Sequence, residues 1–240
     1  DEFNRFISGV MQNVMDQLEQ VHEAESRAAL INFALGKSKC DSSSVINVLA
    51  AYNDSTGSSL TTETLFNSDN FVPFTKWLYA NINNMTRWLA ERSTHYHANV
   101  TGKEVMRHTP ADRLKAYIQA NYLDNIESVA LPSIFGADRM KMIDWEPVTY
   151  WQSTDEAMGM VGTPSYLKAD GTIETSAQPV ALQIVGMLFD EDAVGITRIN
   201  QWSERTPFNA AGGYSNIYWH FTERYWNDFT ENGIILVIGD

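Results

Sequence analysis

The sequence has one cysteine, few basic residues and no long apolar run. Cys40 has no second cysteine to pair with, so the chain forms no internal disulfide. The longest uninterrupted apolar run, Ile234–Ile238, is about five residues, far below the roughly 20 that a membrane-spanning helix needs. Seventeen lysine and arginine residues against 30 acidic ones give a formal net charge of −13. Because basic side chains supply most affinity for phosphates, this charge argues against sequence-specific nucleic-acid binding as the main activity.

The N-terminus carries no recognisable signal peptide. The chain begins with Asp1 rather than methionine, which indicates a processed form or a piece of a longer protein. It has 240 residues, of which 44% are apolar, so it can bury the core of one large domain or of two small ones. We find no internal repeat and no low-complexity tract.

The first 35 residues predict one long helix. Apolar residues recur at steps of three and four from Phe3 to Leu35, which is a continuous helical face. Gly36 is suited to cap its C-terminus, and Lys37 beyond it suits the helix dipole. At about 1.5 Å per residue this helix would be roughly 50 Å long, whereas a compact chain of this size has a radius of gyration of about 18 Å. It is therefore either a bundle or coiled-coil helix, or the spine of an elongated subunit.

The middle of the chain predicts helices first and mixed structure afterwards. Capping residues, apolar spacing and breakers indicate helices over 45–56, 61–67 and 68–92. Beyond these we expect strands over 94–100 and 113–120, a short helix over 121–131, an edge strand over 145–152, a loop over 153–164, and a hairpin joining 165–168 to 172–175.

The last third of the chain reads as strands. Three runs rich in β-branched and aromatic residues, 185–201, 214–228 and 234–238, are separated by polar and glycine-containing breaks. In the middle run Ile217, Trp219 and Phe221 fall on one face. The last run is apolar on both faces, which predicts a strand in the interior of a sheet. We expect all three runs to form one β-layer over the long helix.

Two groups of residues resemble metal or acid–base sites. His95 and His97 would lie on one face of a strand, as at some metal sites, but only His108 is near enough in sequence to be a third ligand. Half-buried or surface histidines are therefore the preferred interpretation. The run Asp190–Asp192 could hold a cation or act in acid–base chemistry. Since it lies between two strand-like runs, we interpret it as an acidic turn.

Other candidates also favour structural roles. Cys40 has no recognisable histidine partner, and Gly212-Gly213 is followed by neither the lysine nor the helix of a phosphate loop. Glu223-Arg224 fits a solvated face or a charge pair. An aromatic cluster could bind sugar, although a core or interface role is preferred; its members are Trp202, Tyr214, Tyr218, Trp219, Tyr225 and Trp226. The sequence thus predicts no catalytic residue, cofactor site or metal ligand, and no enzyme.

Several motifs carry a resemblance to a known family. They are the helix with Glu23-Ala-Glu-Ser-Arg-Ala-Ala and the segments 53–61, 184–197, 207–214 and 225–233. With this order of elements, the chain resembles the major capsid proteins of tailed bacteriophages, which have the Hong Kong 97-type fold. The likeness covers nearly the whole chain and is more specific towards its C-terminal end.

The resemblance implies an α+β fold with a spine helix, a peripheral-domain β-sheet and an inserted axial domain. Residues 1–37 and 183–240 would form the peripheral domain, and residues 38–182 the axial domain. It implies copies of the chain in pentamers and hexamers of an icosahedral shell that encloses DNA, with scaffolding and portal proteins as further partners. The expected location is the virion capsid, and the host cytoplasm during assembly. The family's N-terminal arm and the extended loop before the spine helix have no counterpart in this sequence, which is thus expected to be a fragment.

Two other classes of function stay open at this stage. A carbohydrate-binding or polysaccharide-active protein would use the aromatic strands together with Asp190 and Asp192, in a cleft where carboxyl groups converge. A phage tail or baseplate component would show the same absence of chemistry with a different oligomer symmetry.

Overall fold

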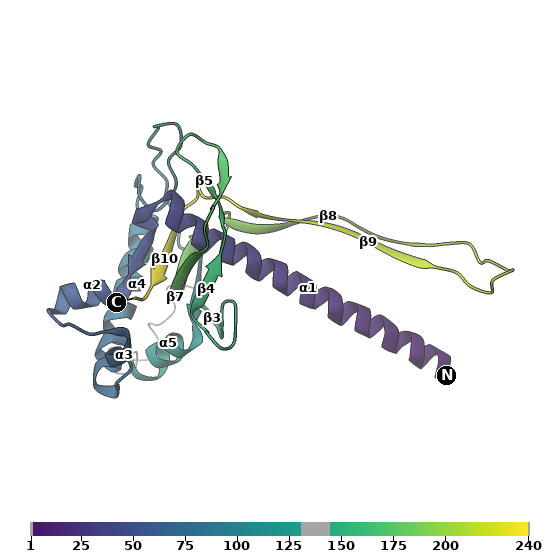
Figure 1. The fold of residues 1–240 in the computed structure, drawn as a ribbon, viewed down its shortest axis with the longest axis horizontal. Coiled ribbons are helices and arrows are strands. Elements are labelled where there is room, and N and C mark those ends of the chain that lie inside the picture. The colour runs from purple at the N-terminus through teal and green to yellow at the C-terminus, as the bar shows by residue number, and fades with distance from the viewer. Residues whose placement is uncertain (1, 131–144, 240) are drawn as a thin grey trace.

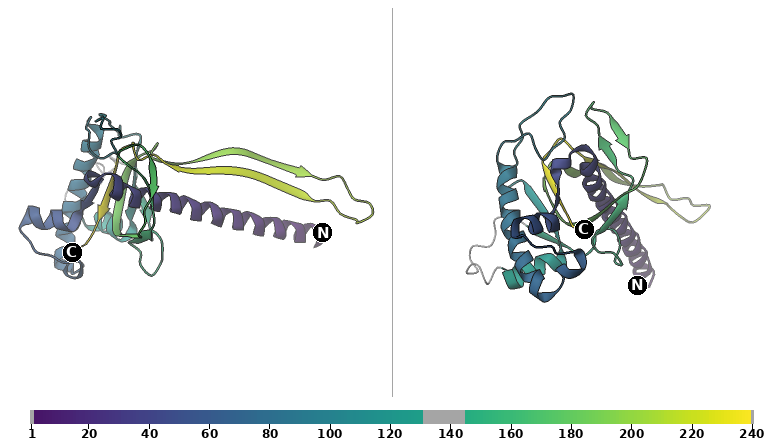
Figure 2. Two further views of the ribbon diagram at one scale, coloured as in Figure 1. Left: turned by 45° about the horizontal axis from the view of Figure 1, so that its top comes forward. Right: turned by 60° about the vertical axis from the view of Figure 1, so that its left-hand side comes forward.

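The computed structural model describes residues 2–130 and 145–239 and shows an α+β body from which two long elements project (Figure 1). One is the N-terminal part of helix α1, Glu2–Cys40. The other is the hairpin formed by strands β8, Val194–Arg205, and β9, Ile217–Asn227. Both leave the body in the same direction, and their outer ends lie apart in Figure 1 and in the right-hand view of Figure 2. The predicted α+β class is confirmed.

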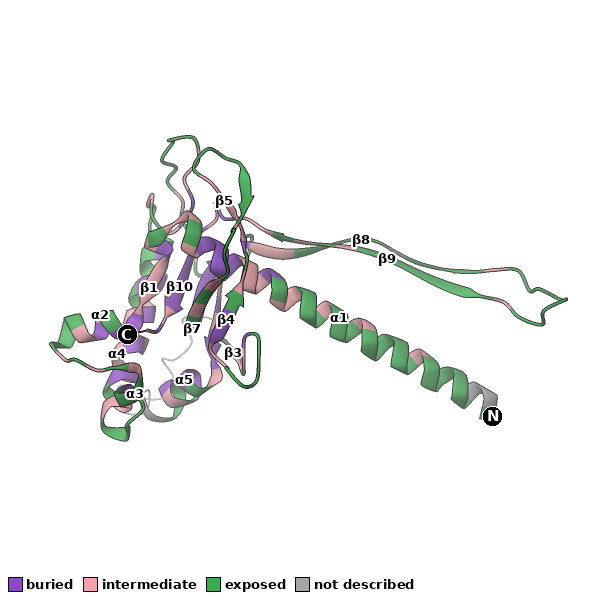
Figure 3. Ribbon diagram, in the orientation of Figure 1, coloured by how far each residue is buried: buried purple, intermediate pink, exposed green. Residues whose placement is uncertain are grey.

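Helix α1 is a single unbroken element, as its periodicity predicts. Its outer part, which we define as residues 2–22, lies beyond the body, and its side chains from Arg5 onward are exposed or half-buried (Figure 3). Phe33, Ala34 and Leu35 are fully buried where the helix crosses the body. The prediction that Gly36 ends the helix is wrong, because α1 continues to Cys40.

A six-stranded mixed sheet forms the centre of the body. Its order is β1-β10-β7-β2-β3, and β4 pairs with the outer end of β7. The strands are β1, Val45–Asn47; β2, Leu114–Gln119; β3, Trp145–Val148; β4, Gly159–Gly162; β7, Val180–Asp190; and β10, Gly233–Val237. β10 lies between β1 and β7, which confirms the predicted interior strand. β3 lies at an edge of the sheet, as Pro147 indicates.

Apolar side chains pack on both faces of this sheet. Ile234 and Leu236 of β10 belong to one cluster, with helix α4, and Ile235 belongs to the other, with the buried end of α1. In β7 the alternation of side chains between the two faces shifts at Val185, the residue that the pairing with β10 skips. This irregularity is a β-bulge, which lets neighbouring residues of one strand re-aim their side chains. One helix layer therefore covers each face of the sheet.

The remaining helices lie mainly on the α4 face. They are the 3-10 turn η1, Ser42–Ser44; α2, Val48–Thr56; α3, Thr62–Leu65; α4, Ser68–Ala90; α5, Ala120–Asn125; and the π-helical turn η2, Ile126–Ala130. Asn47 caps α2 through its side chain, and Gly57 ends it with a left-handed φ of 69°. A short separate hairpin joins β5, Ser165–Leu167, to β6, Ile173–Thr175, as predicted.

The three C-terminal runs do not form one β-layer, so that prediction is wrong. The first run divides into β7 and β8 at a turn over residues 191–193. β8 and β9 pair only with each other, from Val194–Asn227 to Arg205–Ile217, in a separate two-stranded sheet. The physical reason is the turn after Asp190, whose carboxylate is fixed inside the body and directs the following residues away from the sheet.

Four local predictions also need correction. Residues 94–100 form a loop rather than a strand, in which Tyr96 has a left-handed φ of 70°. Residues 45–47 pair with β10 as a strand instead of starting a helix. The expected loop over 153–164 contains β4, which pairs with β7. The helix expected over 121–131 is divided between α5 and η2, and Leu131 lies outside the described residues.

Candidate interaction site

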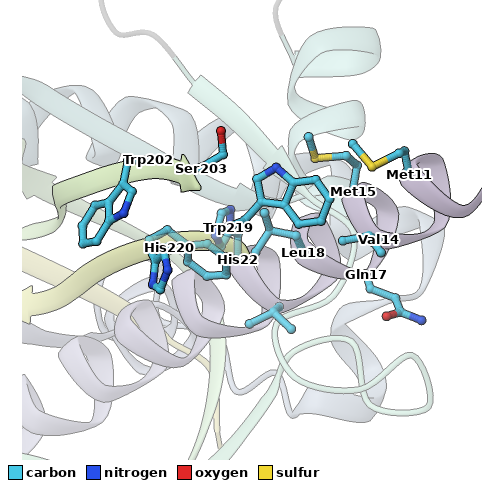
Figure 4. A pocket seen from close by; sticks show the side chains of 12 residues that line it. Met11, Val14, Met15, Gln17, Leu18, His22, Trp202, Ser203, Trp219 and His220 are labelled. Carbon is cyan, nitrogen blue, oxygen red and sulfur yellow. The ribbon is translucent and has the colours of Figure 1, made fainter. Parts of the chain in front are cut away.

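A groove lies between the outer part of α1 and the β8–β9 hairpin (Figure 4). We call it the helix–hairpin groove; its volume is about 510 Å³. From α1 it is lined by Met11, Val14, Met15, Gln17, Leu18, Val21 and His22, and from the hairpin by Trp202, Ser203, Trp219, His220 and Phe221. Most of these side chains are apolar, so the groove can associate with another apolar surface by burying both from water.

The same sequence pattern that predicts the long helix creates this apolar wall. Val14 and Met15 are 43% and 53% exposed, and Val21 is 55% exposed, although their spacing is that of a buried helical face. On the hairpin, Trp202 and Trp219 are 53% and 42% exposed. Such an exposed apolar surface is larger than scattered surface residues produce and is typical of a contact region.

A polar contact joins α1 to the hairpin at the inner end of the groove. The Nε2 atom of His22 lies 3.2 Å from Oε2 of Glu223, whose side chain is only 6% exposed. Glu223 also accepts a hydrogen bond from Nε of Arg198 at 3.1 Å and one from the Tyr225 hydroxyl at 3.0 Å. Burial and the hydrogen bond to Glu223 raise the pKa of Tyr225. The sequence suggested a solvated Glu223 or a pair with Arg224; the observed partners are His22 and Arg198.

The hairpin is also fixed at its base. The side-chain amide of Asn227 donates to the carbonyl oxygen of Ala29 at 3.0 Å, and its own oxygen accepts from Asn32 at 2.7 Å. Asn32 in turn accepts a hydrogen bond from the backbone N–H of Ser165. These amide contacts connect α1, β9 and the β5–β6 hairpin, and so determine where the two projecting elements leave the body.

Lys37 is a buried charged side chain for which the sequence predicted only a favourable interaction with the helix dipole. It is fully buried, and its ammonium group donates to the carbonyl oxygens of Tyr96, Phe229 and Glu231. Burial lowers the pKa of Lys37 from 10.5 to about 8. The group connects α1 to the segment between β9 and β10. Its only sequence signal is a lysine one helical turn after the buried Phe33, which is too weak to indicate burial.

The interpretation of Asp190–Asp192 as an acidic turn is confirmed for Glu191 and Asp192, whereas Asp190 is the buried last residue of β7. Asp190 is buried and accepts hydrogen bonds from the Thr109 hydroxyl at 2.8 Å and from Arg113 at 2.7 Å. Arg113 also contacts Glu191 and Asp192. A single guanidinium therefore contacts three carboxylates. Neither Asp190 nor Asp192 lines the helix–hairpin groove, so the structure does not bring these carboxylates together with the tryptophan residues.

His95 and His97 lie in different environments and do not form a shared site. His97 is buried, and its ring contacts the carbonyl oxygens of Val105 and His95 and the side chain of Asn232. The His95 side chain is exposed. Within residues 2–130 and 145–239, no group of three or more histidine, cysteine or acidic residues is placed to hold a metal ion. Burial raises the pKa of the Cys40 thiol to about 11, so it is a weak nucleophile at neutral pH.

The aromatic cluster is dispersed along the hairpin. Trp202 stacks on His220 with ring centroids 4.8 Å apart, while Trp226 packs over Gly195 near the base. The preferred interpretation was a core or interface role: the core part is wrong, because none of these six residues belongs to a core cluster, and the interface part stays a prediction. In the part of the chain that the structure describes, no helix has both the length and the apolar character needed to cross a membrane.

Comparison with known proteins identifies the fold. No protein-family model matches the sequence, and no curated protein sequence does. A chain from the capsid structure of Staphylococcus phage Andhra aligns with all of this chain at 12% identity and a TM-score of 0.55. A chain from the structure of the head fiber and inner core protein gp22 of native bacteriophage P68 aligns with 98% of it, at 11% identity and a TM-score of 0.59. This chain covers 65% and 64% of the length of those two chains. It therefore has the fold found in these phage head structures, and the resemblance to phage capsid proteins read from its sequence is confirmed at the level of the fold.

Proposed function

We propose that this chain is a structural subunit of a bacteriophage head, and more specifically a major capsid subunit that assembles into an icosahedral shell around DNA. The observation that carries the proposal is the alignment of the entire chain with a chain from a phage capsid structure. The negative charge of the chain is compatible with a shell that encloses DNA without binding it tightly. On this proposal the chain is not an enzyme and resides in the virion, after assembly in the host cytoplasm.

The two projecting elements support self-association. A shell is held together by many modest contacts between identical subunits, and each contact needs apolar surface outside the subunit core. The outer part of α1 and the hairpin supply such surface at apolar residues that stay partly exposed within the subunit, including Val14, Met15 and Trp219. We propose that these surfaces join copies in pentamers and hexamers, and that scaffolding and portal proteins are further partners.

The division into a peripheral domain, 1–37 with 183–240, and an axial domain, 38–182, is part of the same proposal. The central sheet takes strands from both ranges, because β1 pairs with β10 and β2 pairs with β7. We therefore propose that the two parts act as one rigid plate. The Hong Kong 97-type arrangement of such plates in a shell follows from the same resemblance.

Electron microscopy of the assembled protein tests the proposal. Closed shells are the expected product, whereas tubes or fibres would identify a tail or baseplate component instead.

Sedimentation of the purified chain tests the contact surface. Val14→Asp places a charge in the groove and should shift the oligomers towards monomer. Asn13→Asp adds the same charge one residue away, outside the groove lining, and should leave assembly unchanged. Equal effects of both changes, or of neither, would contradict the proposed surface.

A further inference from the structure

Helix α1 carries a seven-residue apolar repeat that runs from its projecting end into the body. The seven positions of such a repeat are named a to g, and apolar residues at a and d form one stripe along the helix. We call this stripe the α1 seam. Its residues at position a are Ile7, Val14, Val21, Ala28 and Leu35, and those at position d are Val10, Gln17, Ala24 and Ile31. All of them except Gln17 are apolar.

The inner end of the α1 seam packs within the chain itself. Leu35 is fully buried, and the half-buried Ile31 packs against the same core cluster, which includes residues of β7 and β10. The apolar residues at these two positions are therefore explained by the fold of a single chain.

The outer part of the α1 seam is exposed. Ile7, Val10 and Val14 each leave 43% of their surface accessible to water. Val21 leaves 55%, and Ala28 is exposed as well. The stretch from residue 7 to residue 28 is roughly 30 Å long at the rise of an α-helix. Most of the seam therefore lacks the apolar cover that its inner end has.

The hairpin does not supply this cover. It is fixed to α1 through His22, Ala29 and Asn32, and none of these three residues belongs to the seam. The helix–hairpin groove runs along one side of the seam and includes Val14 and Val21 in its lining (Figure 4). A further element can thus lie along the seam without displacing the hairpin from its contacts with α1.

We propose that α1 of a second copy covers the seam, in a parallel two-stranded coiled coil over residues 7–28. The proposal rests on the self-association proposed above and names the element of the partner that takes part. Two helices that wind around each other meet every 3.5 residues, so a seven-residue repeat keeps positions a and d directed at the partner helix. The occupant that fits the seam is therefore a helix with the same repeat, and a second copy of this chain supplies one.

The charge pattern around the seam favours pairing of two identical helices. In a coiled coil, positions e and g flank the contact. Over residues 6–21 these flanking positions hold no charged side chain, although 20% of the chain is charged and its net charge is −13. The two charged residues in this range, Asp16 and Glu19, are at positions c and f, on the side away from the seam. Two acidic chains can therefore meet along the seam without bringing like charges together.

Gln17 favours the parallel arrangement in which equal residue numbers face each other. There the two Gln17 side chains meet, and their amides can hydrogen-bond. A shift by one repeat would place this amide against Val10 or Ala24 of the other copy, and an antiparallel pair would place it against an apolar position a. Both alternatives bury a polar group without a partner, which is unfavourable. The β-branched residues at position a also suit a two-stranded parallel pair.

Disulfide cross-linking of the full chain tests the pairing. Single cysteines are introduced in a Cys40→Ala background and oxidised mildly at low protein concentration. The seam variants are Val10→Cys, Val14→Cys and Val21→Cys, and the control is Gln12→Cys at the outward position f. All three seam cysteines should give covalent dimers, and Gln12→Cys at least about tenfold less, because side chains at position f point away from the partner.

Other arrangements give different cross-linking patterns. An antiparallel pair would cross-link at no more than the one position beside its two-fold axis. A contact made through the hairpin would give no preference for the seam cysteines over Gln12→Cys. Either pattern would overturn the proposal, as would the absence of any dimer.

The substitution Gln17→Leu tests the seam by a second route. It replaces the facing amides with apolar side chains and should tighten the dimer by roughly tenfold in its dissociation constant, since a polar residue in the contact lowers coiled-coil stability. Gln12→Leu makes the same change on the far side and should leave the dissociation constant unchanged. Sedimentation equilibrium measures both. Equal effects of the two substitutions, or a weaker dimer for Gln17→Leu, would contradict the coiled coil.

Both measurements can be interpreted apart from shell formation. Positions 12 and 17 are exposed in the single chain, so these variants should fold, and thermal unfolding checks this. Shells that form without the expected cross-links would refute the coiled coil alone. Cross-linked dimers that never give shells would instead refute the proposed capsid function and leave the coiled coil in place.

Discussion

Gly36 of α1 packs directly against the ring of Phe229. A Cβ atom at this glycine would lie 2.5 Å from Cε1 of Phe229 and 3.2 Å from the carbonyl oxygen of Ser165. Gly36 is thus a close-packing position within a continuing helix, at the point where α1 meets the segment between β9 and β10. Glycine normally weakens a helix by roughly 0.5–1 kcal/mol relative to alanine, and this contact explains why it is present.

The first prediction follows from that contact. Gly36→Ala should lower the free energy of unfolding by about 1–3 kcal/mol, because the added methyl group displaces a buried ring. Gly9 is the matched control on the same helix, since nothing lies within 4 Å of a Cβ placed there. Gly9→Ala should leave the stability unchanged or raise it by at most about 1 kcal/mol. Chemical denaturation of both variants measures the difference, and a neutral Gly36→Ala would contradict the packing.

The buried ammonium group of Lys37 predicts an unusual pH dependence. Its folded pKa of about 8 is below its ordinary value of 10.5, so between these values the unfolded chain binds more protons than the folded one. Stability therefore rises with pH in this window. Between about pH 7.5 and about pH 9.5 the contribution of Lys37 should increase by roughly 2 kcal/mol.

The variant Lys37→Met isolates this effect. It has no ammonium group to titrate, so its stability should lack the rise seen in the wild type over the same pH range. Denaturation curves at several pH values, compared between the two proteins, measure the difference. A constant difference between them across the range would mean that Lys37 keeps its ordinary pKa in the folded protein.

Arg113 should be important for the turn after β7. Its removal leaves the carboxylate of Asp190 buried without a cation, which for a fully buried pair costs about 3–5 kcal/mol. Since 37% of the Arg113 side chain is exposed, water screens part of this interaction, and Arg113→Ala should lower the stability by less than the loss of a fully buried partner would. Lys168→Ala removes an ion pair with Glu174 in which both side chains are exposed, and it should lower the stability less than Arg113→Ala does. Thermal unfolding of the two variants tests the ranking.

The outer hairpin should be dispensable for folding of the body. Arg198 and Glu223 are cross-strand partners, so residues 199–222 can be replaced by an Asn-Gly turn. The free energy of unfolding should change by less than about 1 kcal/mol, because none of these residues belongs to the core. By contrast, Ile235→Ala in the fully buried β10 should cost about 2–5 kcal/mol. Loss of the folded state on hairpin removal would show that the hairpin contributes to the core after all.

Local sequence patterns predicted individual helices and strands better than they predicted how these elements pack together. The spacing of apolar residues determined the long helix, and the two apolar faces of β10 indicated its interior position. The same reasoning placed Gly36 at the end of α1, because a glycine near the end of a periodic run usually marks a cap. Only the tertiary contact with Phe229 shows its actual role.

The candidate site shows why contacts between distant elements could not be predicted from the sequence. Val14 and Trp219 carry the signature of buried residues, yet both are exposed on projecting elements. Periodicity states which residues share a face, and it does not state whether this chain or another one covers that face. Likewise, His22 is distant from Glu223 in sequence, and only the crossing of α1 with the hairpin brings the two together.

The parallel pairing of Val45 with Ile235 has a consequence for biosynthesis. β1 is made early, but its neighbour β10 lies almost two hundred residues downstream, so the ribosome must release most of the polypeptide before the sheet can close. Until then the edges of β1 and β7 are open to pairing with other nascent chains. A stalled or truncated product lacking residues 233–237 would keep these edges open and should be prone to aggregation.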